Sequence, residues 1–380
     1  MKKKILCLFV VCLMAFCSSK RVEAVSLAKE ATGAILIDCD SGQILFSKNE
    51  TKKLYPASTT KIMTMILLFE AINNQSLKWN DVLSCSKYAA SMGGSQVYLE
   101  ENEKMTVQEL FKCIAIASAN DACVVVAEAI GGSHEEFVSM MNKKAKELKL
   151  VNTHFVNCTG LHDANHYTCA LDLAKMGQYL IKIGGQKLFS ITSLYDSYIR
   201  EDTQKKFWLV NTNKLLKQYD GVDGLKTGYT KEAGYCLVTT CKKKQLRLIG
   251  VLMDESEPKV RNSEMIEMMN FGFSQYSKKD LYKKGDVIDK KIVRDMVEHK
   301  VNIISKKDIH YLQYNGDQNQ IKTKINYHQL TLPISKDKAI GELSLLKDGV
   351  EIARYPLYSQ NNVKKMSFIQ KMQRVYQDMI

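Results

Sequence analysis

Two kinds of local pattern divide the chain, and their order constrains the fold more than any other feature. Helix signals run from Pro56 to Ile183, whereas the segments on either side favour strands. A helical block enclosed by β structure predicts an α+β domain, in which helices pack on an antiparallel sheet. The predicted strands are Ala34–Asp38 and Gln43–Ser47, joined by a turn at Asp40-Ser41-Gly42, and then Leu225–Thr230, Tyr235–Cys241 and Leu246–Met253, before a helix over Ser263–Phe273.

The helical block carries its own start and stop signals. Pro56 can open a helix at its first turn, and Ile62–Phe69 is apolar on nearly every face, which predicts a helix buried at the domain centre. A break at Ser118-Ala119-Asn120 separates two apolar helices, and Asp121 is the expected cap of the second. The last helix of the block is expected to end at Gly184-Gly185.

A second domain is expected because 380 residues exceed what one compact core usually organises. From about Leu281 to Ser359 the segments are short and strand-like, with the clearest hairpin turn at Lys347-Asp348-Gly349. The sequence therefore predicts a large α+β domain over residues 25–277 and a small all-β domain, of the sandwich type, over residues 278–360.

The first residues have the pattern of a signal peptide. Lys2–Lys4 are basic, Ile5–Cys17 is an apolar run too short to cross a bilayer comfortably, and Val22-Glu23-Ala24 offers a cleavage site. Cleavage would remove five basic residues and one acidic residue from a net charge of +13. We expect residues 1–24 to be removed and the mature protein to be exported; the alternative is an uncleaved anchor.

Eight of the eleven cysteines follow the predicted cleavage site. No pair has the CxxC spacing of a zinc knuckle, and several lie in strand-like or helical runs. We expect them to be small core residues, although an exported protein could also pair them in disulfides. The eight are Cys39, Cys85, Cys113, Cys123, Cys158, Cys169, Cys236 and Cys241.

The segment Ser58-Thr59-Thr60-Lys61 brings a hydroxyl and an amine together on one face of a helix's first turn. A free serine is a poor nucleophile and needs a base within hydrogen-bond reach. A lysine beside a mostly apolar helix can lose its proton near neutral pH, because burial disfavours the ammonium form. The N–H groups at the helix start also suit an oxyanion. Ser58 is a candidate nucleophile and Lys61 a candidate base; the plain alternative is a capped helix with a surface lysine.

Two further polar segments occur where a cleft could use them. Ser118 and Asn120 lie at the predicted break between helices, where they face a cleft or cap the helix. Lys226-Thr227-Gly228 lies on a strand, and its glycine would let a substrate backbone approach closely; otherwise Lys226 is an edge-strand lysine that blocks aggregation. In this order the SxxK, SxN and KTG motifs form the set shared by penicillin-binding proteins and class A β-lactamases.

The segments around these motifs resemble the low-molecular-weight D-alanyl-D-alanine carboxypeptidases. The resemblance runs from about Ala31 to Phe273 and continues more weakly to the tail. It implies a catalytic domain of the β-lactamase/transpeptidase type, with helices on an antiparallel sheet, followed by the small all-β domain. The segments that carry it are Tyr55–Thr64, Ala117–Ala122, Asn152–Phe155 and Val222–Thr230.

The same resemblance implies a role for each candidate residue. Ser58 is the acylated nucleophile and Lys61 its general base. Because relatives vary between histidine and aromatic residues at the position of Tyr229, only a backbone role is implied there. The other roles are proton transfer and substrate positioning for Ser118 and Asn120, binding of the terminal carboxylate for Lys226 and Thr227, and an oxyanion hole made of the N–H groups of Ser58 and Tyr229.

The implied substrate is a peptidoglycan stem peptide that ends in D-Ala-D-Ala. Ser58 attacks the carbonyl of the penultimate D-Ala, the terminal D-Ala leaves, and water hydrolyses the acyl-enzyme. β-Lactams would acylate the same serine, because they mimic the dipeptide. The reaction needs neither a metal nor an organic cofactor.

One motif imitates a metal site. His162-Asp163-Ala164-Asn165-His166 has the spacing of the HExxH zinc helix, with aspartate in place of glutamate. Gly160 and the polar residues around the motif favour a loop, which would not present both imidazoles to one ion. We therefore expect no metal site at this position.

Residues 361–380 predict a short basic amphipathic helix. Lys364, Lys365, Lys371 and Arg374 supply positive charge against Asp378. Such a helix lies in an anionic membrane interface or packs on its own β domain, and the family resemblance favours the membrane. We expect attachment to the outer face of the bacterial cytoplasmic membrane. The apolar residues recur at spacings of three and four: Met366, Ile369, Met372, Val375, Tyr376, Met379 and Ile380.

Three other functions compete with the carboxypeptidase. A β-lactamase is disfavoured because no ExxLN segment lies between Asp121 and Lys226, and Glu147 is wrongly spaced from Asn152. A non-catalytic, penicillin-binding scaffold of the cell wall would keep the same motifs. A nucleic-acid binder ranks last, because the predicted export and the lack of a basic groove pattern count against it, and we expect no nucleic-acid partner.

Overall fold

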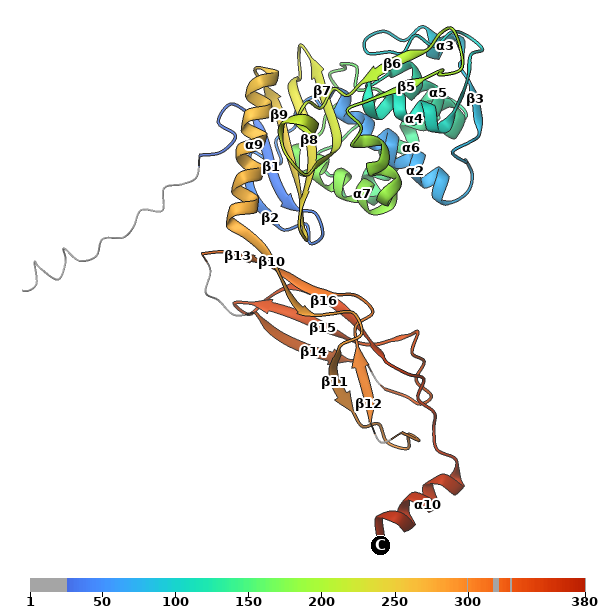
Figure 1. Cartoon of the computed structure of the whole chain (residues 1–380), viewed down its shortest axis with the longest axis vertical. Helices are drawn as coiled ribbons and strands as arrows, with labels where there is room; N and C mark the ends of the chain where they lie inside the picture. The colour runs from blue at the N-terminus through green and yellow to red at the C-terminus, as the bar shows by residue number, and fades with distance from the viewer. Residues whose placement is uncertain (1–25, 299, 317–320, 329, 380) are drawn as a thin grey trace, which may run out of the picture.

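The computed structural model describes residues 26–298, 300–316, 321–328 and 330–379. Figure 1 shows a larger body of helices around a sheet, a smaller body made of strands, and a helix at the C-terminal end. These bodies correspond to the predicted α+β domain and all-β domain. The signal peptide predicted at residues 1–24 lies outside the described residues.

The larger domain is built on a five-stranded antiparallel sheet. Its strand order is β2-β1-β9-β8-β7, so the N-terminal hairpin joins the edge of a meander that lies much later in the chain. Apolar residues of β1 alternate between the two faces of this sheet, as the two-residue period of a strand requires. The strands are β1 Gly33–Asp38, β2 Ile44–Lys48, β7 Val222–Thr230, β8 Gly234–Lys243 and β9 Leu246–Glu255.

Helices cover both faces of the sheet. On one face α9 (Pro258–Gln275) packs its methionines against Leu36 and Leu248, and on the other lies the helical block. The remaining helices are α2 Lys61–Asn73, α3 Lys87–Ala90, α4 Val107–Ile116, α5 Asn120–Gly131, α6 His134–Glu147, α7 Ala170–Thr192 and α8 Leu215–Gln218. Two short hairpins border this block: β3 Val82–Ser84 with β4 Lys104–Thr106, and β5 Asp196–Ile199 with β6 Phe207–Val210.

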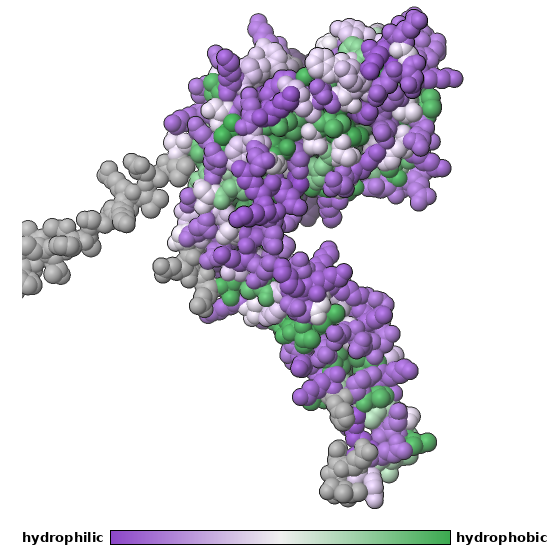
Figure 2. All heavy atoms as spheres, in the orientation of Figure 1, coloured by the Kyte–Doolittle hydropathy of each residue, from purple (hydrophilic) through white to green (hydrophobic). Residues whose placement is uncertain are grey.

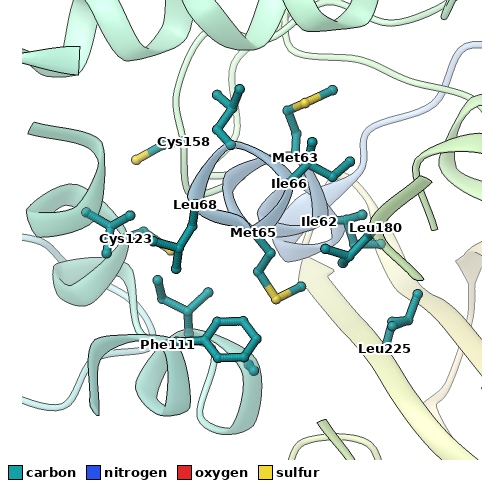
Figure 3. Packing of buried hydrophobic residues seen from close by; sticks show 14 of the residues in the cluster. Ile62, Met63, Met65, Ile66, Leu68, Phe111, Cys123, Cys158, Leu180 and Leu225 are labelled. Atoms are coloured by element: carbon teal, nitrogen blue, oxygen red, sulfur yellow. The ribbon is translucent and has the colours of Figure 1, made fainter. Parts of the chain in front are cut away.

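The prediction of a buried central helix is confirmed by α2, in which every residue from Lys61 to Phe69 is buried. Figure 3 shows this helix enclosed by side chains from several elements, among them Phe111 of α4, Cys123 of α5 and Leu225 of β7. All eight cysteines from Cys39 to Cys241 are buried and unpaired, which confirms their reading as small core residues.

Three predicted helix ends differ from the structure. The turn after Pro56 is a short 3-10 helix, η1 (Ala57–Thr60), and the α-helix begins only at Lys61. Asp121 does not cap α5, because the N-cap residue is Ala119. The carboxylate of Asp121 instead accepts hydrogen bonds from the backbone N–H groups of Val97 and Leu99. Gly185 breaks the helical geometry as predicted, yet α7 resumes beyond it, because Leu188 and Ile191 still find places in the core.

The smaller domain is all β, as predicted. A five-stranded sheet with the order β11-β12-β16-β15-β14 shares one apolar core with the β10-β13 pair. The predicted hairpin turn at Lys347-Asp348-Gly349 joins β15 to β16. The strands are β10 Tyr276–Tyr282, β11 Val287–Lys291, β12 Val301–Ile304, β13 Ile309–Tyr314, β14 Lys322–Tyr327, β15 Ala339–Lys347 and β16 Val350–Ser359.

The C-terminal helix α10 (Phe368–Met379) turns its polar side toward the β domain. Arg374 donates to the carbonyls of Met296 and Val297, and Lys371 pairs with Asp295. The apolar residues from Phe368 to Tyr376 are exposed, and Figure 2 shows hydrophobic residues at the surface of this end of the molecule. Among the described residues, no helix has the length and apolarity needed to cross a bilayer.

Candidate active site

Five of the eight predicted site residues line one open cavity of about 480 Å³ between the helical block and strand β7. Ser58 lies there in η1, directly after Ala57, whose φ of 47° is in the left-handed region. A non-glycine residue rarely adopts this conformation without support from its surroundings. The other predicted residues at the cavity wall are Ser118, Thr227, Gly228 and Tyr229, whereas Lys61, Asn120 and Lys226 lie buried behind it.

Lys61 is fully buried, and its Nζ atom contacts three oxygens: Ser58 Oγ at 2.8 Å, Asn120 Oδ1 at 2.7 Å and the carbonyl of Thr159 at 2.7 Å. Two of these oxygens belong to carbonyl groups, which can only accept hydrogen bonds. A neutral amine therefore gives its two protons to Asn120 and Thr159, and its lone pair faces the hydroxyl of Ser58. Desolvation by burial lowers the pKa of Lys61, which favours this neutral form.

Asn120 connects the base to a loop that the sequence did not point to. Its Oδ1 accepts from Lys61, its Nδ2 donates to the carbonyl of Gly93 at 2.7 Å, and its backbone N–H donates to the carbonyl of Ser95. Ser95 itself lines the cavity. Gly93 and Ser95 accept hydrogen bonds from Asn120 through their backbone carbonyls. Any residue type could supply a backbone carbonyl, so the sequence carries no signal for this loop.

Ser118 lies at the predicted break between α4 and α5. Its φ of 64° turns the chain sharply, so that α4 ends before it and α5 starts at Asn120. This turn presents Ser118 to the cavity wall. The prediction that a helix break brings both polar residues of the SxN motif to the site agrees with this geometry.

Lys226 is almost completely buried, which contradicts the alternative of a solvent-exposed edge-strand lysine. Its Nζ donates to the carbonyl of Thr227 at 2.9 Å. Burial, and then the nearby Lys61, lower the pKa of Lys226 well below that of an ordinary lysine. Thr227 reaches the cavity and donates to Thr212 Oγ1 at 2.7 Å, and Thr212 is a second cavity residue that sequence reasoning missed.

Gly228 is needed for a contact within the protein as well as for any substrate. A Cβ atom at this position would lie 2.9 Å from the carbonyl of Pro56 and 2.9 Å from the amide nitrogen of Ser58. Strand β7 can therefore lie directly against η1 only because residue 228 lacks a side chain. The next residue, Tyr229, is exposed and stacks on Tyr235, with 4.3 Å between ring centroids.

The cavity wall carries positive charge from residues outside the three motifs. Lys214, Lys259 and Arg261 line it, and no aspartate or glutamate is among its lining residues. Arg261, on α9, is buried at the wall and bonded to Asn262. A basic cavity without a carboxylate suits an anionic ligand. No pattern in the sequence around α9 indicated this contribution.

The segment that imitates a zinc motif is a loop, as predicted. His162 packs edge-on against Tyr55, while His166 is buried and contacts Thr60, so the two rings have separate partners. Within the described part of the chain, no group of three or more histidine, cysteine, aspartate or glutamate side chains lies close enough to hold a metal ion.

Comparison with known proteins agrees with this geometry. Residues 19–257 match the family model described as D-alanyl-D-alanine carboxypeptidase, and residues 276–365 match that of the penicillin-binding protein 5 C-terminal domain. The chain is 45% identical to the D-alanyl-D-alanine carboxypeptidase DacF of Bacillus subtilis, over 96% of this chain and 94% of that protein. It is 30% identical to DacC of Escherichia coli, over 95% and 90% of the two chains.

Solved structures show the same similarity. Penicillin-binding protein 5 from Haemophilus influenzae superimposes with a TM-score of 0.76 at 29% identity, covering 90% of this chain and all of that chain. Penicillin-binding protein D2 from Listeria monocytogenes, in its cefotaxime-bound form, superimposes with a TM-score of 0.59 at 29% identity, covering 66% and 99% of the two chains. On the family models, the relatives and the fold together, the chain belongs to the D-alanyl-D-alanine carboxypeptidases, the low-molecular-weight penicillin-binding proteins.

Proposed function

We propose that this serine carboxypeptidase removes the terminal D-Ala from peptidoglycan pentapeptide stems through an acyl-enzyme on Ser58. The observation that carries the proposal is the contact between a fully buried lysine amine and the serine hydroxyl, at 2.8 Å. Hydrogen-bond reach and a lowered pKa are what a general base needs. The basic wall of the cavity supports a substrate that ends in a carboxylate.

We assign each step of the reaction to one group of the site. Lys61 takes the proton of Ser58 as Oγ attacks the penultimate D-Ala carbonyl. The resulting oxyanion accepts hydrogen bonds from the backbone N–H groups of Ser58 and Tyr229. The tetrahedral intermediate collapses as the C–N bond breaks, and the proton passes by way of Ser118 to the leaving D-Ala amine. The carboxylate of that D-Ala is held near Thr227, with the buried amine of Lys226 behind it. Water then attacks the ester and frees Ser58.

A direct test locates the acyl group and follows the product. The purified mature protein is incubated with benzylpenicillin and mapped by peptide mass, and separately with a muramyl pentapeptide while released D-Ala is quantified. We expect the penicilloyl group on the peptide that contains Ser58, together with stoichiometric conversion of pentapeptide to tetrapeptide. Labelling without D-Ala release would favour the scaffold protein, and rapid turnover of penicillin would favour the β-lactamase.

We also propose that the protein is exported and held at the outer face of the cytoplasmic membrane by α10. Two observations support the attachment: the apolar residues of this helix are exposed, and Lys364 and Lys365 beside it are exposed as well. Lys371 and Arg374 are occupied by the β domain, which orients the helix with its apolar residues outward. An amphipathic helix of this kind binds an anionic membrane interface.

Removal of residues 368–380 is expected to weaken binding to vesicles containing phosphatidylglycerol by about tenfold or more, since both the apolar area and part of the charge are lost. The cut is placed after Ser367 because Val363 is buried in the β domain and paired with Ile334. Vesicle co-sedimentation measures the effect, with D-Ala release as the control for an intact catalytic domain. Equal sedimentation of the full-length and truncated chains would refute the anchor.

A further inference from the structure

Two residues that the motif leaves without a role are joined behind the nucleophile. His166 is buried, its Nδ1 lies 3.1 Å from the backbone nitrogen of Val156, and its Nε2 lies 2.8 Å from Thr60 Oγ1. A backbone N–H can only donate, so Nδ1 accepts, and the proton of the neutral ring is on Nε2. Burial lowers the pKa of His166 to about 4, so the ring is neutral at ordinary pH. His166 therefore donates to the hydroxyl of Thr60.

The hydroxyl of Thr60 passes this orientation on to the nucleophile turn. Because it accepts from His166, its own proton is free for the carbonyl of Ala57, which lies 2.8 Å away. That carbonyl and the N–H of Ser58 belong to one peptide unit, which is planar, so they point in opposite directions. A hydrogen bond that holds the Ala57 carbonyl on the buried side thus aims the Ser58 N–H at the cavity.

The peptide unit needs such support because Ala57 has a positive φ of 47°. Gly160 closes the remaining space: a Cβ there would lie 1.8 Å from the Ala57 oxygen and 2.8 Å from Thr60 Oγ1. The carbonyl is therefore both hydrogen-bonded and packed on its buried side. Successive hydrogen bonds in a buried chain also polarise one another, which strengthens the last N–H as a donor.

We propose that His166 and Thr60 are positioning residues that hold the Ala57–Ser58 peptide unit in the orientation required of an oxyanion-hole donor. Neither touches the reacting atoms; both act through the hydrogen-bonded chain from Val156 to Ala57. This inference rests on the proposed role of Ser58, whose N–H stabilises charge that develops only as the tetrahedral intermediate forms. Loss of the chain should thus affect the acylation step more than the binding of the ligand.

The test compares hydroxyl loss in two adjoining helices, at Thr60 of η1 and at Thr64 of α2. Thr60→Val removes the relay, and Thr60→Ser restores a hydroxyl at the same place. Thr64→Val is the matched control, since Thr64 is equally buried on α2 and also donates to a backbone carbonyl, that of Cys158. His166→Phe removes the other end of the chain while keeping a ring, and a Thr60→Val/His166→Phe double variant tests whether both act through one path.

The rate of acylation by a chromogenic cephalosporin, its saturation constant, and the infrared frequency of the acyl-enzyme ester carbonyl are measured for each variant. We expect Thr60→Val and His166→Phe to slow acylation about 10- to 100-fold with the saturation constant within about twofold, and to raise the carbonyl frequency because the oxyanion-hole bonds weaken. The double variant should be no slower than the slower single variant. Thr60→Ser should recover most of the rate, and Thr64→Val should lose thermal stability but leave the rate and frequency unchanged.

Either of two results in the single variants would overturn the inference: an unchanged carbonyl frequency and acylation rate in Thr60→Val, or a loss of rate in Thr64→Val equal to that in Thr60→Val. The inference would also be overturned if the fold-loss of acylation rate in the double variant equalled the product of the losses in the two single variants, because the two residues would then act independently. Failure of the proposed function is distinguishable, because peptide mapping would then find the acyl group on a residue other than Ser58, whatever the rates of these variants.

Discussion

Replacement of Lys61 by methionine is expected to slow acylation of Ser58 by about 100- to 10,000-fold, the range that a positioned general base contributes. Nζ of Lys61 lies within hydrogen-bond distance of Ser58 Oγ and can take its proton, and it is held there by Asn120 and Thr159. Methionine preserves most of the buried volume but cannot accept a proton. The acylation rate with a chromogenic cephalosporin measures the effect, and Ser58→Ala sets the floor of the assay.

A second variant separates a base from a mere hydrogen-bond partner. Lys61→Arg keeps donors for the carbonyl oxygens, but a guanidinium does not deprotonate in proteins, so it should be about as slow as Lys61→Met. Thermal unfolding checks that both variants fold, because the methionine side chain would leave two buried acceptors without a donor, at a cost of about 1–3 kcal/mol each. Rapid acylation by either variant would exclude Lys61 as the base.

The pH dependence of the unmodified protein gives an independent check on the same residue. Only the neutral amine can accept the Ser58 proton, so the acylation rate should rise with pH as Lys61 deprotonates. Because burial lowers the pKa of Lys61, the midpoint of this rise should lie below the ordinary lysine value of 10.5. A midpoint at or above the ordinary value would contradict the role of Lys61 as the base.

The sequence predicted the site where short motifs specify chemistry and local structure together. Ser58 and Lys61 are one helical turn apart, so their contact at 2.8 Å follows from local geometry. Ser118 reaches the cavity because the predicted break occurs between the two helices. In each case the residue type and the spacing were sufficient, since no distant segment had to be placed first.

The rest of the site depends on contacts between distant segments. Thr159 and Gly93 serve it through backbone carbonyls, which carry no signal of residue type. Arg261 reaches the cavity from α9, which packs on the other face of the sheet from the helical block. No motif in the sequence around Arg261 indicates a functional role. His166 attracted attention for its spacing to another histidine, whereas its actual partner is Thr60, 106 residues earlier in the chain.

Helix boundaries show the same division between local and tertiary effects. Asp121 is a good N-cap residue by type, yet its carboxylate bonds the N–H groups of Val97 and Leu99, 24 and 22 residues earlier. The break at Gly185 was predictable from glycine, but the resumption of α7 depends on core positions for Leu188 and Ile191. Local sequence preference predicted that something would change at these two positions, and tertiary packing determined the structure that formed there.

Replacement of Gly160 by alanine is expected to destabilise the protein by about 2–5 kcal/mol, which is a large loss of stability for a single substitution. Its φ of 86° is in the left-handed region, which costs a residue with a Cβ about 1–2 kcal/mol. The added Cβ would also lie 1.8 Å from the carbonyl oxygen of Ala57, so the backbone must shift, at a cost of about 1–3 kcal/mol. Urea denaturation followed by circular dichroism measures the sum.

Gly132→Ala is the control that separates these two costs. Its φ of 79° imposes the same backbone strain, but no atom lies within 4 Å of the added Cβ, so only about 1–2 kcal/mol should be lost. Equal losses in the two variants would show that the Ala57 carbonyl moves without resistance. If instead Gly160→Ala loses more, the displaced atom is the carbonyl of the Ala57–Ser58 peptide unit. The molecules that remain folded should then also acylate more slowly than those of Gly132→Ala, because the strain falls on the nucleophile turn.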